Sequence, residues 1–327
     1  MINMNFYSIV IYEIILVSAL LIIWTIRDLH RPGLFLNRYK NFAYSVIILL
    51  SIFIICAIDT RFIEPNIITK NEFDLPTANL KIPIKVVFIS DLHIGKYKKS
   101  SWTQKIVNKI NIIKPDLVLI GGDFIVNEGA FEDETQYLEP LKQLTAKYPI
   151  YYVFGNHEYG MSGNSIDSIK GQTGDRSGLL AKKMQELGIP LLLNQLICPK
   201  IKDQPICIFG INDIWENDFN FKELKNWNKT TPLILLAHNP DAILFYPKNE
   251  PPPNITLAGH THGGQIRLPF IGALGDAKIA LPKQFYKGLN DWKGAKVFTS
   301  VGLGESGGPV RFWNPPEIAV INLKPQN

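Results

Sequence analysis

The stretch Val86-Val87-Phe88-Ile89-Ser90-Asp91-Leu92-His93 decides the fold of this chain. It begins as a short apolar run, Val86–Ser90, and ends in a polar turn that carries a carboxylate and an imidazole. A short apolar run bounded by a turn is typical of a strand that is buried on both faces. The stretch therefore predicts a buried strand with Asp91 and His93 just beyond its carboxyl end.

The same arrangement recurs along the chain. Apolar runs at 117–121, 151–154, 233–237 and 255–258 are followed at once by Gly122-Asp123, by Gly155-Asn156-His157-Glu158, by His238 and by Gly259-His260-Thr261-His262. Ligands bind beyond the carboxyl ends of strands in open α/β sheets, so these motifs are expected to converge on one site. Five of the six histidines lie in the motifs, and only His30 lies outside them. Imidazoles gathered beside carboxylates indicate a metalloenzyme.

Helical patterns alternate with these runs. Apolar residues at helical spacing predict helices over Ser101–Ile113, around residues 137–144 and over Leu179–Leu187. Two more strands are predicted at 297–300 and 318–321. The alternation of strand and helix predicts an α/β fold with helices on the outside of the sheet.

Two apolar runs, Phe6–Ile26 and Phe42–Ile58, precede this pattern. The first contains Glu13 as its one ionisable residue, and the second contains none. At about 1.5 Å per residue, each can cross most or all of a hydrocarbon core roughly 30 Å thick. Residues 1–60 are therefore predicted to form a membrane hairpin with helices at about 6–26 and 42–58, with two buried core helices as the alternative. Glu13 is either a functional group inside the membrane or a side chain that reaches the interface.

Charges around the two runs indicate an orientation. The loop between the runs holds four basic residues, Arg27, Arg31, Arg38 and Lys40. The stretch after the second run holds only two, Arg61 and Lys70. The leader before the first run holds no basic residue. The positive-inside rule then places the loop in the cytoplasm and the C-terminal domain outside.

Cys198 and Cys207 flank a predicted hairpin that turns near Lys202-Asp203. A two-residue turn there would place the two cysteines opposite one another, and a disulfide would fit an oxidising compartment. Two small buried residues on a pleated face explain the pattern equally well.

The remaining chain divides into two parts. Residues 61–83 are expected to be a linker or lead-in strand, and residues 84–327 a single domain. The net charge is +5, but Lys and Arg are scattered, so no nucleic-acid partner is expected. The sequence does not define an oligomeric state.

From about residue 85 to 323 the motif series resembles that of the calcineurin-like metallophosphoesterases. Ala237-His238-Asn239-Pro240-Asp241 and Gly259-His260-Thr261-His262-Gly263-Gly264-Gln265 are similar to a membrane-associated branch. That branch is related to the bacterial proteins YkuE and YaeI and includes a lipid A pathway pyrophosphatase acting on UDP-diacylglucosamine. The resemblance implies a sandwich of two mixed β-sheets flanked by helices.

The resemblance also implies a centre of two divalent metal ions, Mn, Fe or Zn. The first ion would be bound by Asp91, His93 and His262, the second by Asn156, His238 and His260, and both by the bridging Asp123. Two ions about 3.5–4 Å apart would hold a bridging hydroxide that attacks phosphorus in line with the leaving oxygen. His157 would stabilise the transition state or protonate the leaving group, with a purely positioning role as the alternative.

Other residues are expected to support this centre. Glu158 and Asp241 would orient imidazoles. Arg267 and Arg311 could each meet a phosphate, and a structural salt bridge is the alternative for Arg311. The loop Tyr159–Ser177 is expected to lie beside the site and to select substrate.

These features predict a membrane-anchored phosphoesterase that hydrolyses a lipid-linked phosphodiester or pyrophosphate. The alternative is the same chemistry on a soluble nucleotide or other phosphoester, and a remote alternative is a non-catalytic scaffold. An apolar groove beside the metals would favour the lipid, and a small polar pocket the soluble substrate. UDP-linked lipids lie on the cytoplasmic leaflet, so that particular substrate conflicts with the orientation that the charges indicate.

Overall fold

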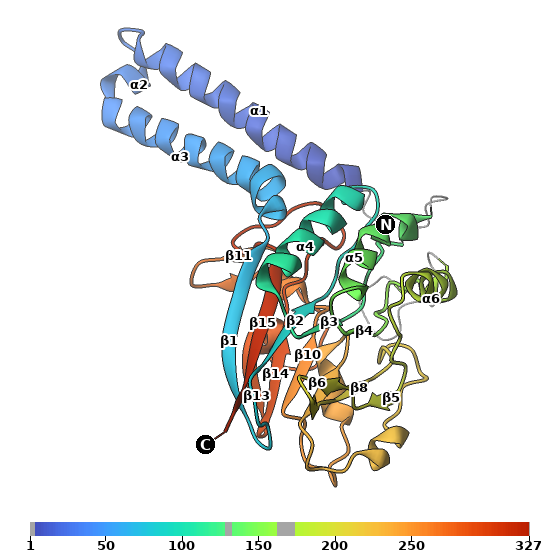
Figure 1. Ribbon diagram of the computed structural model, residues 1–327. Coiled ribbons are helices and arrows are strands. Elements are labelled where there is room, and N and C mark those ends of the chain that lie inside the picture. The colour runs from blue at the N-terminus through green and yellow to red at the C-terminus, as the bar shows by residue number, and fades with distance from the viewer. Residues whose placement is uncertain (1–3, 128–132, 162–173, 327) are drawn as a thin grey trace.

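Two β-sheets packed face to face form the centre of the soluble part (Figure 1). The computed structural model describes residues 4–127, 133–161 and 174–326. The strand order is β1-β15-β2-β3-β4 in the first sheet and β13-β14-β10-β9-β8-β5 in the second. Both sheets mix parallel and antiparallel pairs, so the predicted α/β fold with two mixed sheets and outer helices is confirmed.

The first sheet holds the strand predicted from the opening stretch. Its strands are β1 (Thr69–Thr77), β2 (Ile84–Ile89), β3 (Leu117–Ile120), β4 (Ile150–Tyr152) and β15 (Glu317–Pro325). β2, β3 and β4 run parallel, whereas β15 is antiparallel to β2. The carboxyl ends of the three parallel strands therefore lie at one edge of the sheet.

The second sheet has a parallel centre and antiparallel borders. Its strands are β5 (Gln195–Ile197), β8 (Cys207–Gly210), β9 (Leu233–Leu236), β10 (Ile255–Ala258), β13 (Gly288–Trp292) and β14 (Ala295–Thr299). The parallel strands are β8, β9, β10 and β14. A separate hairpin, β11 (Arg267–Leu268) and β12 (Gly272–Ala273), follows the last histidine motif.

Side-chain alternation along β2 explains the layers. Val86 and Phe88 belong to the core between the sheets, where Phe88 meets Phe298 of β14 edge to face at 6.4 Å between ring centroids. Val87 and Ile89 belong to the other buried cluster, beneath the helix α4 (Ser100–Ile113). A strand covered on both faces has no polar side, which is why β2 is almost continuously apolar.

Short helices cover the outside of the sandwich. The helix expected around residues 137–144 is instead a 3-10 helix, η3 (Glu134–Leu141), followed by one turn of α-helix, α5 (Lys142–Thr145). Pro140 cannot donate the backbone bond that a regular helix needs at that position. The other elements are α6 (Ser177–Glu186), η4 (Lys222–Asn226), η5 (Pro240–Phe245), η6 (His262–Gly264) and η7 (Lys283–Tyr286).

The two N-terminal apolar runs form helices that project from the domain (Figure 1). They are α1 (Met4–Leu29) and α3 (Lys40–Ile58), joined through the short α2 (Phe35–Arg38). Both are long and apolar enough to cross a membrane, and only 17% and 11% of their most apolar windows is buried. A pair of buried core helices is therefore not what the chain forms.

The chain between α3 and the first sheet contains more structure than a linker. α3 continues through a π-helical turn, η1 (Asp59–Ile63), and a 3-10 turn, η2 (Glu64–Asn66). β1 then pairs in parallel with β15 along all nine of its residues. The alternative of a lead-in strand thus describes this segment better than a linker does. β1 is an edge strand with a half-exposed pattern, so its role depends on a partner far along the chain.

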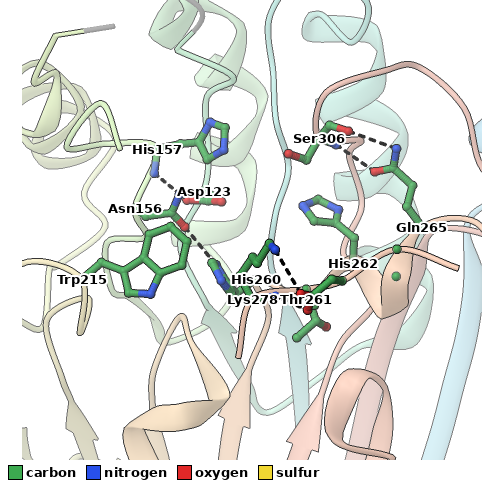
Figure 2. A pocket seen from close by; sticks show the side chains of 14 residues that line it. Asp123, Asn156, His157, Trp215, His260, Thr261, His262, Gln265, Lys278 and Ser306 are labelled. Carbon is green, nitrogen blue, oxygen red and sulfur yellow. Dashed lines mark hydrogen bonds and ion pairs between the residues drawn. The ribbon is translucent and has the colours of Figure 1, made fainter. Parts of the chain in front are cut away.

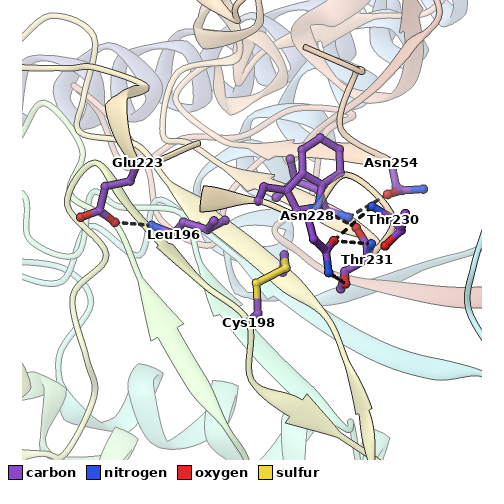
Figure 3. The surroundings of a disulfide bond; sticks show 10 residues. Leu196, Cys198, Glu223, Asn228, Thr230, Thr231 and Asn254 are labelled. Atoms are coloured by element: carbon purple, nitrogen blue, oxygen red, sulfur yellow. Dashed lines mark hydrogen bonds between the residues drawn. A yellow bond between two sulfur atoms is a disulfide. The ribbon is translucent and has the colours of Figure 1, made fainter. Parts of the chain in front are cut away.

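The cysteine hairpin forms as the sequence suggests. Lys202 and Asp203 both have positive φ, 48° and 61°, and connect β6 (Lys200–Ile201) to β7 (Gln204–Pro205) in a two-residue turn. This register brings Cys198 opposite Cys207, and the two form a disulfide (Figure 3). The alternative of two unbonded buried cysteines is therefore wrong.

Candidate active site

The predicted motifs meet where the carboxyl ends of both sheets come together. Asp91 and His93 follow β2, Asp123 follows β3, and Asn156 follows β4. The second sheet contributes residues after β9 and β10, which are His238, His260 and His262. All seven are buried or nearly so, and their functional atoms face one another (Figure 2 shows the part that lines the pocket).

The backbone at these turns is unusual. Asp91, His93, Asp123, His260 and His262 have φ between 42° and 68°, in the left-handed region that side chains other than glycine seldom adopt. Such conformations persist only where the surroundings enforce them, and they cluster at functional sites. Two neighbouring glycines allow the close approach, because a Cβ at Gly155 would meet Asp123 and one at Gly259 would meet Asp91.

Asp91, His93 and His262 form the first cluster. His93 Nε2 lies 3.1 Å from His262 Nε2, and His262 Nε2 lies 3.5 Å from Asp91 Oδ1. His262 Nδ1 donates to the carbonyl oxygen of Gly304 at 3.2 Å, so its Nε2 presents a lone pair to the cluster. The imidazole is thereby oriented as a metal ligand would be.

Asn156, His238 and His260 form the second cluster. Asn156 Oδ1 lies 3.1 Å from His238 Nε2 and 2.9 Å from His260 Nδ1. His238 Nδ1 donates to the carbonyl oxygen of Gly121 at 2.7 Å, which directs Nε2 toward Asn156 and Asp123. The two ring nitrogens that face each other are 3.3 Å apart.

Asp123 lies between the two clusters. Its Oδ2 is 3.5 Å from His93 Nε2 and 3.2 Å from His238 Nε2, one residue from each cluster. Burial by itself would raise the pKa of Asp123, but the surrounding histidines, His238 first, hold it well below the usual value. The carboxylate is therefore ionised and able to bridge two cations.

The donor set fits divalent metal ions. In both clusters two imidazole nitrogens lie about 3 Å apart and face a carboxylate or amide oxygen, so a cation at the centre of each cluster would be surrounded by donor atoms. Burial, and then repulsion from neighbouring histidines, lowers the pKa of His93 and His262 well below the usual value and that of His260 to about 3. These imidazoles are neutral, which is the form that binds metals. Carboxylate, imidazole and amide oxygen together suit Mn, Fe or Zn.

Glu158 and Asp241 do not orient imidazoles, contrary to expectation. The Glu158 carboxylate is fully buried and accepts backbone N–H bonds from Asp123, Phe124 and Gly155 at 3.0, 2.8 and 2.7 Å. It thus holds together the two loops after β3 and β4. Asp241 accepts the backbone N–H groups of residues 280 and 281, and so fixes the segment behind the pocket wall.

His157 lies beside the clusters and lines the pocket. Its backbone N–H donates to Asp123 Oδ1 at 3.0 Å, and its Nδ1 donates to the carbonyl oxygen of Val126 at 2.6 Å. The ring centroid is 4.6 Å from that of His93. With Nδ1 occupied, Nε2 is the ring atom free to act on a bound substrate.

The pocket above these residues has a volume of about 400 Å³. Its lining is mostly polar, the condition that favours a soluble substrate over a lipid. Trp215 stands on one side, edge to face with His260 at 4.8 Å, and Gln265 and Lys278 line the other walls (Figure 2). Sequence reasoning missed Trp215 and Lys278 because no short motif marks them, and it quoted Gln265 only as the end of a motif, without a role.

Neither predicted phosphate-binding arginine lies in the pocket. Arg311 is fully buried and donates to Glu305 and to the carbonyl oxygens of residues 301, 304 and 314, so its alternative role as a structural ion pair is the correct one. Arg267 donates to the carbonyl oxygen of Gly263 at 2.7 Å. Residues 162–173 of the expected substrate loop lie outside the described residues.

Comparisons with known proteins agree with this geometry. The family model of the calcineurin-like phosphoesterases matches residues 84–264. The uncharacterized metallophosphoesterase YkuE of Bacillus subtilis (strain 168) is 29% identical over 276 residues, 82% of this chain and 89% of that protein. The phosphodiesterase YaeI of Escherichia coli (strain K12) is 28% identical over 246 residues, 74% of this chain and 82% of that protein. The predicted branch is therefore confirmed.

The name of a eukaryotic relative describes it as a transmembrane protein. The transmembrane protein with metallophosphoesterase domain of Danio rerio is 29% identical over 253 residues, 74% of this chain and 53% of that protein. Together with the two apolar helices, this relative supports membrane association. The chain belongs to the calcineurin-like phosphoesterase family and is a metal-dependent phosphoesterase.

Proposed function

We propose that this protein is a membrane-anchored hydrolase that uses two divalent metal ions to cleave a phosphodiester or pyrophosphate bond of a lipid-linked substrate. The observation that carries the hydrolytic part is the pair of ligand clusters that share Asp123 at the base of a polar pocket. Asp91, His93 and His262 would hold one ion, and Asn156, His238 and His260 the other.

The two ions would activate the attacking water and neutralise the charge of the phosphoryl oxygens. The chain's own residues do the rest. Asp123 keeps both ligand clusters in one fixed arrangement, and Glu158 holds the loops that carry Asp123 and Asn156. His157 presents Nε2 to the pocket and, when its ring is protonated, can donate a proton from this atom to the leaving oxygen. Lys278 lies on the pocket wall in an ion pair with Asp276 at 3.0 Å, and its ammonium would turn to an anionic substrate that enters the pocket.

Contacts between the anchor and the metal site support a substrate that stays in the bilayer. Glu64, six residues after α3, accepts the backbone N–H groups of Trp313 (2.8 Å) and Asn314. Asn314 in turn donates from Nδ2 to the carbonyl oxygen of His262 at 2.6 Å. Two hydrogen-bonded residues thus connect the end of the apolar hairpin to a metal ligand, and this connection would bring the pocket close to the surface of a membrane that the hairpin crosses.

Two features support an extracytoplasmic catalytic domain. The basic loop between the helices lies at the end of the hairpin away from the domain (Figure 1), in agreement with the positive-inside rule. The Cys198–Cys207 disulfide fits an oxidising compartment. A lipid exposed on the outer face of the membrane is therefore a better candidate than a UDP-linked lipid of the cytoplasmic leaflet.

A soluble phosphoester is the second candidate, because the pocket lining is polar and its volume of about 400 Å³ suits a small substrate. A polar pocket also suits a lipid whose headgroup alone enters it. The two candidates differ in whether the acyl chains contribute to turnover.

An activity panel on the purified full chain with Mn tests the proposal. The substrates are bis-p-nitrophenyl phosphate, p-nitrophenyl phosphate, phospholipids in mixed micelles and a UDP-linked diacyl sugar. His238→Ala should abolish turnover, and His30→Ala, which changes the one histidine outside the five motifs, should not. Turnover of the UDP-lipid would contradict the orientation, turnover of small esters alone would favour the second candidate, and no turnover by the metal-loaded protein would favour a scaffold.

A further inference from the structure

The hairpin β11–β12 exposes three large apolar side chains at its tip and base. Phe270 is fully exposed, and Ile271 and Leu274 are 71% and 55% exposed. Single exposed apolar residues are common on soluble proteins, but three on one short projecting loop indicate an interaction surface. We call residues 269–274 the apolar tip.

The base of this hairpin lies against the membrane helices. Ile266, directly before β11, packs in one cluster with Ile11 and Ile15 of α1, Ala57 of α3 and Val310. Ile15 lies seven residues beyond Ser8, where the first candidate span begins, and so about 10 Å along the helix. The domain therefore already contacts the helices beside positions that belong to the apolar spans, and the apolar tip extends from this contact.

Other exposed apolar residues continue the same surface. Phe62 and Ile63, in the turn after α3, are 41% and 48% exposed. Trp313 is 61% exposed, and its backbone is bonded to Glu64 in the next turn. Aromatic side chains at the end of a span are typical of the membrane interface. Figure 1 shows β11 directly beneath the end of α3, in agreement with these contacts.

The chain on both sides of the apolar tip forms the wall of the pocket. Gly264 and Gln265 precede β11, Gly275–Lys278 follow the tip, and all of them line the pocket above the metal ligands. Backbone bonds join the two sides, since the N–H of Leu274 donates to the carbonyl oxygen of Ile266 at 3.0 Å. The position of the apolar tip therefore also determines the position of the pocket opening.

We propose that the apolar tip inserts into the phospholipid bilayer that α1 and α3 cross, so that the pocket opens at the membrane surface and receives lipid headgroups there. The inference rests on the proposed membrane anchoring and extends it to the route of the substrate. The bilayer is the occupant because the tip continues the lipid-exposed surface of the two helices. Insertion by Phe, Ile and Leu to a depth of roughly 5–10 Å is usual for interfacial segments.

The first experiment measures insertion without reference to turnover. In a Cys56→Ala background, Ile271→Cys carries an environment-sensitive fluorophore, and the full chain is placed in phosphatidylglycerol–phosphatidylcholine nanodiscs. Lys293→Cys, an exposed position in the turn that joins β13 to β14 at the opposite end of the sheet from the site, is the matched control. We expect a blue shift and quenching by spin-labelled lipids at residue 271 and neither at 293. Water-like emission at both positions would overturn the proposal.

The second experiment measures the consequence for access. The double variant Phe270→Asp, Ile271→Asp should lose turnover of phospholipid in nanodiscs and keep that of bis-p-nitrophenyl phosphate. Equal turnover of the lipid by the variant and the wild type would refute the role in access. If the wild-type protein hydrolyses no lipid, the proposed substrate fails, and the fluorescence experiment still decides whether the tip inserts.

Discussion

Gly155→Ala tests the idea that the metal site depends on close packing of its loops. The residue lacks a side chain at the point where the loops after β3, β4 and β9 meet. Its φ is not positive, so alanine is allowed there and the effect of the change is steric alone. A Cβ would lie 2.8 Å from the backbone nitrogen of Asp123 and 2.8 Å from Cγ of His238, besides meeting the Asp123 carboxylate.

The magnitude follows from these contacts. Non-bonded carbon atoms prefer separations of about 3.5–4.0 Å, so Asp123 and His238 must each move by roughly 1 Å. Misplacement of catalytic groups by about 1 Å costs on the order of 100-fold in rate, or about 2.7 kcal/mol of transition-state stabilisation. Overpacking of this kind lowers the free energy of unfolding by about 1–3 kcal/mol. No metal ligand is removed, so the loss of activity should exceed what a partly unfolded fraction explains.

The assay is turnover of bis-p-nitrophenyl phosphate across a Mn titration, with thermal unfolding measured on the same samples. Gly178→Ala is the matched control, because that helical glycine has no atom within 4 Å of the added methyl group. It should leave activity unchanged and raise the free energy of unfolding by less than the roughly 1 kcal/mol that such a change gives in the middle of a helix, because Gly178 lies in the first turn of α6. Wild-type activity and metal affinity in Gly155→Ala would refute the packing argument.

Three further predictions concern the metals, the pocket and the disulfide. Metal binding should release protons and become tighter as pH rises. Burial lowers the pKa of His238, but the opposite effect of the surrounding carboxylates, Asp123 first, outweighs it and raises the pKa well above the usual value. The ring must therefore lose a proton to bind a metal, and a pH-independent affinity in a weakly buffered titration would contradict this. Lys278→Gln should raise KM for anionic substrates by roughly 2- to 5-fold with little change in kcat, because it removes an exposed cation worth up to about 1 kcal/mol and leaves its ion-pair partner Asp276 facing the substrate; an unchanged KM would remove Lys278 from substrate binding. Replacing Cys198 and Cys207 together by serine should lower the free energy of unfolding by about 2–3 kcal/mol and leave activity intact, and equal denaturant midpoints of the oxidised protein and the variant would count against a stabilising disulfide.

Much of the site was predictable because its signals are local. A short apolar run followed by a polar turn specifies a buried strand and the residue at its carboxyl end, and this holds for Asp91 after β2 and for His238 after β9. The two-residue turn at Lys202-Asp203 likewise determines the register of the cysteine hairpin. The two N-terminal apolar runs predicted helices that are apolar on every side, with no separate polar face. In each case the information lies within about ten neighbouring residues.

The tertiary structure decided what depends on distant partners. β1 is a weakly patterned edge strand that becomes part of the sheet only because β15, about 240 residues later, pairs with it. Arg311 is a structural ion rather than a phosphate ligand because packing surrounds its guanidinium with carbonyl oxygens and Glu305. Trp215 and Lys278 enter the pocket from irregular segments that no periodicity describes. Local sequence determines hydrophobic period and turn geometry, whereas the contacts between segments far apart in the chain exist only once the two sheets have packed.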